Sequence, residues 1–132
     1  MKLLLDTHAF LWAAFSPRKL SARVRAAVVD GENTVAVSSL SFWELSLKFS
    51  LGKIALEGCT PDELPGVARQ MQFDILEADA DDMASFHALP RLAHKDPFDR
   101  MIIWQAIRQG WTLVSKDHSF DAYKSHGLTV WW

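Results

Sequence analysis

The stretch KLLLDTHAFLWAAF at residues 2–15 carries the strongest indication of the fold class. Lys2–Leu5 is a short apolar run, which is typical of a buried strand, and it ends at Asp6. From Thr7 to Phe15 the apolar residues recur at helical spacing. The stretch therefore predicts a strand followed by a helix.

The same alternation continues along the chain. Further strands are expected at 34–38, 73–76, 112–115 and 128–132, and helices at 20–29, about 39–51, 79–88 and 97–109, with irregular helix near 60–66. Alternating strands and helices favour a mostly parallel sheet covered by helices on both faces. We therefore expect an α/β protein, a single-domain α/β/α sandwich spanning residues 1–132.

Composition narrows the class of protein. With 132 residues, 49% of them hydrophobic and 23% charged, the chain has the profile of one globular domain. The single cysteine, Cys59, excludes an internal disulfide and any Cys-x-x-Cys zinc or redox motif. No run approaches the roughly 18 apolar residues of a membrane span, so we expect a cytoplasmic protein. The net charge of -2 neither favours nor excludes a nucleic-acid partner.

Four acidic residues stand where acids are unusual. Asp6 follows an apolar strand directly, and Asp117 follows another after two intervening residues, so both belong to the edge where ligands bind in parallel sheets. Glu44 and Asp99 each share a helical stripe with apolar residues. Burying an unpaired carboxylate costs several kcal/mol, so each needs a base, a proton or a cation.

An ordinary structural explanation exists for several of these acids. Asp99 is a candidate capping-box partner, Glu44 a partner of Lys48, and Asp117 a partner of Lys116 or His118. All four acids at one sheet edge are better explained by a shared cation. An all-oxygen site suits Mg²⁺ or Mn²⁺, and two such ions catalyse phosphodiester hydrolysis in nucleases.

Four motifs carry a resemblance to a known family. They are LLLDTH at 3–8, SFWEL at 41–45 with GKI at 52–54, HKDPFDR at 94–100 and SKDHSF at 115–120. In this order and spacing the chain strongly resembles the PIN-domain ribonucleases, and among them the VapC-type toxins of toxin-antitoxin modules. The resemblance runs from Met1 to about Tyr123.

The resemblance implies a metal-dependent endoribonuclease and places the metal-binding, catalytic acids at Asp6, Glu44, Asp99 and Asp117. Asp96 is then a helix cap or an outer-shell ligand. It also implies an RNA substrate, Mg²⁺ or Mn²⁺ as cofactor, inhibition by a VapB-type antitoxin and a homodimer.

Residues around the acids suggest contacts with substrate and partner. Lys95, Arg100 and Lys116, with Arg18 and Lys19, are candidates for phosphate contacts, which position RNA without reading its sequence. Aromatic and apolar residues on the two helices beside the site predict a groove for an amphipathic partner helix, with Trp12, Phe15, Trp43 and Leu47 in contact. His8 and His118 are expected to be hydrogen-bonding neighbours of the site.

Two other functions share the feature of an acid at a strand end. A receiver-like binding switch requires a pair of adjacent acids at the first strand end, and Asp6 has no acidic neighbour. A phosphatase with an aspartate nucleophile usually has a second aspartate two residues later, where this chain has His8. Both alternatives fit the sequence less well than a nuclease.

Overall fold

The computed structural model describes residues 1–132, and its centre is one five-stranded sheet. The strand order is β3-β2-β1-β4-β5, and all four neighbouring pairs are parallel. The strands are β1 (Lys2–Leu5), β2 (Thr34–Ser38), β3 (Asp74–Leu76), β4 (Thr112–Val114) and β5 (Thr129–Trp131). The α/β class and the parallel sheet are thus confirmed.

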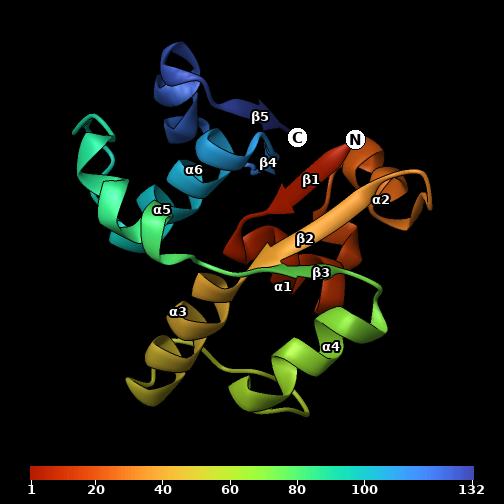
Figure 1. Cartoon of the computed structure of the whole chain (residues 1–132). Helices are drawn as coiled ribbons and strands as arrows, with labels where there is room; N and C mark the ends of the chain where they lie inside the picture. The colour runs from red at the N-terminus through yellow and green to blue at the C-terminus, as the bar shows by residue number, and fades with distance from the viewer.

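Helices cover both faces of the sheet (Figure 1). The α-helices are α1 (Thr7–Phe15), α2 (Ala22–Val29), α3 (Ser39–Ser50), α4 (Leu64–Gln70), α5 (Ala80–Ser85) and α6 (Pro97–Gln109). Short 3-10 helices add η1 (Pro17–Lys19), η2 (Pro61–Glu63), η3 (Phe86–Ala88) and η4 (His118–His126). None of these helices has the length and hydropathy of a membrane span.

The core has two halves because side chains of a strand alternate between the faces of the sheet. Leu3 and Leu5 of β1 pack with α1, α2 and α4, whereas Leu4 packs with α6 and η4 on the other face. All three leucines are fully buried. A continuous apolar run is what a central parallel strand needs, since both of its faces are covered.

Three local features differ from the sequence predictions. Helix α3 is capped by Ser38, whose Oγ accepts from the N–H of Leu40 at 3.1 Å, and not by Ser39 or Ser41. Pro65 lies inside α4, in the first turn, where a missing N–H costs nothing. Helix η4 was not predicted, because its residues show no long apolar period.

Candidate active site

The candidate site lies at the carboxyl edge of the sheet. Asp6 follows β1 directly and Asp117 lies three residues beyond β4. Because β1 and β4 pair in parallel, their carboxyl ends are neighbours. Helix α3 starts at the residue after β2, and its second turn carries Glu44, while the first turn of α6 carries Asp99. The topology thus gathers acids from four separate segments.

Asp6 is a buried carboxylate at the start of α1. Its Oδ1 accepts from the N–H of Ala9 at 2.7 Å, and the residue is 6% exposed. Burial raises the pKa of Asp6, although hydrogen bonds from Ser115 and Ala9 oppose the rise, and the negative charge of Asp117 adds to it. Burial and a second acid both disfavour its charged form, which a cation would favour.

Glu44 is buried more deeply, at 2% exposed, and has two partners. Thr7 Oγ1 donates to its Oε1 at 2.7 Å, and Lys48, one turn further along α3, forms an ion pair with its Oε2. Burial alone would lower the pKa of Lys48, but the bond to Glu44 outweighs it and raises that pKa. The pairing with Lys48 predicted as the ordinary explanation for this acid is therefore present.

The side chains of Asp96 and Asp99 make different contacts at the start of α6. Asp96 Oδ1 caps the helix by accepting from the N–H groups of Phe98 at 2.9 Å and Asp99 at 3.0 Å. Asp99 Oδ2 lies 2.9 Å from His94 Nε2. Burial, together with the charges of Asp96 and Glu44, raises the pKa of Asp99 to about 6 against the opposing bond from His94. The capping role predicted for Asp96 is confirmed.

Asp117 is the exposed member of the set. Its Oδ1 accepts from the N–H of Ser119 at 2.9 Å, which caps η4, and its own N–H donates to Ser115 Oγ at 3.1 Å. Its partial burial acts to raise the pKa of Asp117, but the bonds from Ser119 outweigh it and lower that pKa. No ion pair joins Asp117 to Lys116 or His118; His118 faces Asp121 at 3.7 Å instead.

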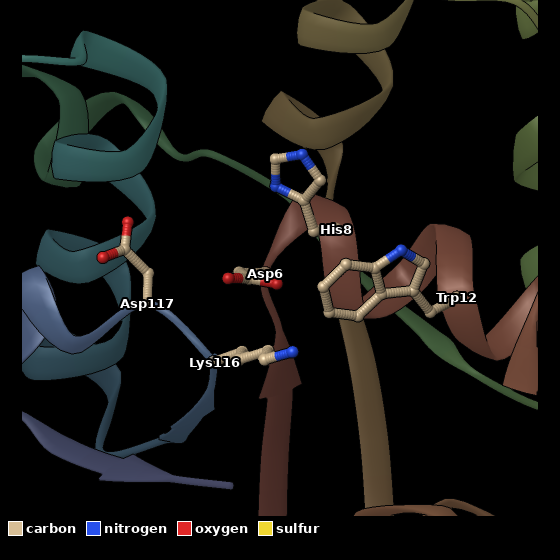
Figure 2. Close-up of a pocket in the computed structure, with 5 residues that line it drawn as sticks. All are labelled: Asp6, His8, Trp12, Lys116 and Asp117. Carbon is tan, nitrogen blue, oxygen red and sulfur yellow. The ribbon is translucent and has the colours of Figure 1, made fainter. Parts of the chain in front are cut away.

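The donor atoms form two groups that share Asp99. Glu44, Asp96 and Asp99 each place a carboxylate oxygen within 4.8 Å of the others, and His94, Asp99 and Asp117 meet the same limit. Asp6 belongs to neither group, but it faces Asp117 across a pocket of about 260 Å³ (Figure 2). These donors, mostly hard oxygens with one imidazole, suit a divalent cation. Burial, with repulsion from Asp96 and Glu44, disfavours the charged form of Asp99, and such a cation would offset both effects.

A family model for the PIN domain matches residues 3–125, which include all four acids. The chain belongs to the PIN domain family. Ribonuclease VapC22 from Mycobacterium tuberculosis is 29% identical to this PIN domain over 130 residues, 98% of each chain.

Solved structures support the same architecture. A chain of VapBC2 from Rickettsia felis, in a complex with a promoter DNA fragment, has a TM-score of 0.69 and 17% identity and covers 99% of this PIN domain and 98% of itself. A chain of DNA-bound VapBC from Salmonella typhimurium has a TM-score of 0.66 and 15% identity, with coverages of 99% and 97%. Identities this low establish a shared fold only.

The pocket of the PIN domain between Asp6 and Asp117 also contains cationic and aromatic side chains. Figure 2 shows His8, Trp12 and Lys116 around the two acids. Lys116 Nζ lies 5.9 Å from the Trp12 ring centroid, and the Trp12 ring packs edge-on against Trp132 at 5.8 Å. The pocket therefore offers a positive charge and an aromatic surface beside the carboxylates.

The other predicted contact residues of the PIN domain lie in several places. Lys95 is exposed beside the site, but Arg100 donates to the carbonyls of Leu89 at 3.3 Å and Pro90 at 3.4 Å. Trp12 and Phe15 line one hollow with Leu56, and Trp43 lines another with Phe98. Trp43 is 60% exposed and Leu47 40%, so both are available on the surface.

Sequence reasoning missed Thr7 and His94 as parts of this site. Thr7 immediately follows Asp6, so its hydroxyl was close to a candidate acid, but its partner Glu44 lies 37 residues away. His94 precedes the Asp96 cap in a segment without periodic pattern, and the sequence predicts an all-oxygen site with no nearby cluster of histidine or cysteine. The structure corrects that interpretation, because the imidazole contacts Asp99 directly.

Proposed function

We propose that this PIN domain is a metal-dependent endoribonuclease and the toxin of a type II toxin-antitoxin pair. The observation that carries the proposal is the arrangement of four acids at the carboxyl edge of the sheet. Asp99 has donor atoms near both Glu44 and Asp117, and Asp6 faces Asp117 across an open pocket. Its 29% identity to Ribonuclease VapC22 and its likeness to chains of VapBC complexes support the same activity and a VapB-type antitoxin as partner.

The four acids would hold Mg²⁺ or Mn²⁺. When bound, a divalent cation activates water and neutralises negative charge on the phosphodiester. Asp6 and Asp117 face the pocket, while Thr7 and Lys48 hold the Glu44 side chain. Asp96 Oδ1 is engaged in the α6 cap and holds the N–H of Asp99, so we assign Asp96 a supporting role beside the cation.

The substrate is RNA, bound along the pocket rim. Lys116 extends over the Trp12 ring and would contact a phosphate, while the ring offers a stacking surface to a base. Lys95 is a second candidate for phosphate contact. Arg100 has a smaller part, since its guanidinium is engaged by two backbone carbonyls and lies over the Phe86 ring.

The catalytic assignment is tested by RNA cleavage with Mg²⁺, Mn²⁺ or chelator. Asp6→Asn and Asp99→Asn should each reduce the rate on the order of 10²-fold, because each removes a charge that holds the cation. Asp96→Asn should cost less, since asparagine also caps helices. Asp74→Asn, at an exposed position of β3, is the matched control and should leave the rate unchanged.

The assignment would be wrong if Asp96→Asn abolished cleavage while Asp99→Asn kept most of it. The nuclease proposal itself would be wrong if wild-type protein cleaved no RNA with either ion, or cleaved equally well in chelator.

The antitoxin would lie along α1 and α3, on the surface of Trp12, Phe15, Trp43 and Leu47. Phe15→Ala should weaken the complex with the product of the neighbouring gene by about 2 kcal/mol, because exposed aromatic side chains dominate such interfaces. Phe15 is 42% exposed, so its loss should leave the fold intact. Val29→Ala on α2, at 81% exposed, is the control in the same calorimetric titration. Equal affinities of the two variants would place the antitoxin elsewhere.

A further inference from the structure

His94 is a histidine in a site that otherwise consists of carboxylates, and both of its ring nitrogens have partners there. Its side chain is 15% exposed, and its ring packs edge-on against the buried Phe120 ring at 5.2 Å. This packing fixes the orientation of the imidazole. One ring nitrogen faces Asp99 and the other faces Ser119.

The first of these nitrogens contacts Asp99, and the imidazole also lies near Asp117. Nε2 lies 2.9 Å from Asp99 Oδ2, and donor atoms of His94, Asp99 and Asp117 all lie within 4.8 Å of one another. Neighbouring ligands of an octahedral ion with bonds of about 2.1 Å lie roughly 3 Å apart, and opposite ligands roughly 4 Å apart. Three segments of the chain thus bring donor atoms to separations that one cation can bridge.

The second nitrogen has the partner that a metal-binding histidine needs. Nδ1 lies 3.0 Å from Ser119 Oγ. Metal-binding histidines nearly always donate their other N–H to an oxygen acceptor, and the Ser119 hydroxyl can accept this bond. With its proton on Nδ1, His94 donates to Ser119 Oγ and directs the Nε2 lone pair toward Asp99. The N–H of Ser119 also holds Asp117 Oδ1 at 2.9 Å, so Ser119 supports two of the three donors.

We propose that His94 is a nitrogen ligand in the metal site and that the site therefore favours Mn²⁺ over Mg²⁺. The inference rests on the proposed metal dependence and names a further ligand. A nitrogen donor favours first-row transition-metal ions, whereas Mg²⁺ prefers oxygen ligands. The alternative is that His94 donates from Nε2–H to Asp99 and only holds that carboxylate in place.

Pulsed EPR of the wild-type protein loaded with Mn²⁺ separates these two roles. A directly bound imidazole gives a ¹⁴N coupling that changes to the ¹⁵N pattern when the protein is made with ¹⁵N-histidine. We expect this coupling in the wild type and its loss in His94→Gln. In His118→Gln, the control on the exposed side of η4, it should remain.

Calorimetry supplies a second measurement that is independent of activity. His94→Gln should weaken Mn²⁺ binding by about 10-fold or more and Mg²⁺ binding by less, and Ser119→Ala should weaken Mn²⁺ binding in the same direction. Because the His94 ring packs against Phe120, circular dichroism and melting curves check that both variants keep the fold.

The proposal is overturned if Mn²⁺ binds to the wild type without a histidine coupling, or if the coupling persists in His94→Gln. Equal losses of Mn²⁺ and Mg²⁺ affinity in His94→Gln would assign His94 the positioning role. These results would leave the nuclease proposal standing, provided that Asp99→Asn still abolishes binding of both ions. Absence of binding of either ion to the wild type would overturn both proposals.

Discussion

Asp99 is a residue at which negative charges of the site come close together. It is about a quarter exposed, it faces Asp96 and Glu44, and these surroundings raise its pKa to about 6. The folded protein without metal therefore keeps Asp99 protonated up to a higher pH than an ordinary aspartate, to about pH 6. Because the pKa is raised above its ordinary value of 3.8, its contribution to stability is full below that value and is lost as the pH rises through about 6.

This behaviour predicts that Asp99→Asn stabilises the metal-free protein at neutral pH. In chelator at pH 7.5 or so, we expect the variant to melt above the wild type, by roughly 4 °C for each 1 kcal/mol of relief. The advantage should shrink as the pH falls below about 6 and vanish below 3.8, where Asp99 is protonated in both folded and unfolded states. Melting curves across this range test it, and a difference independent of pH would contradict the raised pKa.

At the scale of elements, α3 and α6 must hold Glu44 and Asp99 at a constant separation. A buried hydrogen bond links the two helices: Ser38 Oγ, which caps α3, donates to Gln105 Oε1 of α6 at 2.6 Å. Gln105 Nε2 also donates to the carbonyl of Glu77 after β3 at 3.4 Å. Ser38 and Gln105 are both fully buried, so each depends on the other for a partner.

Ser38→Ala should therefore destabilise the protein by about 2 kcal/mol, since it removes a helix cap and leaves a buried amide oxygen without a donor. Ser50→Ala, at the exposed end of the same helix, should change the stability little. The measurement is urea unfolding of both variants. The double variant Ser38→Ala/Gln105→Leu removes both polar partners, so it should be more stable than Ser38→Ala alone. If Ser38→Ala and Ser50→Ala were equally stable, the hydrogen bond between Ser38 and Gln105 would contribute nothing to stability.

At the scale of the whole molecule, the fold brings acids from four segments to one edge of the sheet, where burial and mutual repulsion disfavour their charged forms. A cation that binds only the folded state should offset both effects and stabilise the fold. Millimolar Mn²⁺ or Mg²⁺ should thus raise the melting temperature of the wild type, and the gain should be smaller in Asp6→Asn. A melting temperature unaffected by both ions would show that Thr7, Lys48 and His94 alone compensate these acids.

We also predict a homodimer, since apolar side chains remain exposed on α3 and α5. Trp43 is 60% exposed and Met83 50%, and both line a mainly apolar hollow of about 230 Å³. Sedimentation equilibrium should give twice the mass of 14.9 kDa, and Met83→Ala should shift the equilibrium toward the monomer. A monomer at high micromolar concentration would contradict this prediction.

The sequence by itself determined the order of strands and helices and the parallel class of the sheet. These depend on local patterns: the apolar run of β1, the cap at Asp96 and the left-handed C-cap at Gly110 are all properties of neighbouring residues. It also marked the four acids, because the carboxyl ends of parallel strands meet at one edge.

Only the tertiary structure decided which side chains meet there. His94 reaches Asp99 and Ser119 along an irregular segment, Thr7 bonds to Glu44 across 37 residues, and Arg100 turns to the carbonyls of Leu89 and Pro90. Such contacts depend on the path of loops and on the register between distant segments. Local patterns carry no information about either, because the same local sequence fits many loop paths until the packed core selects one.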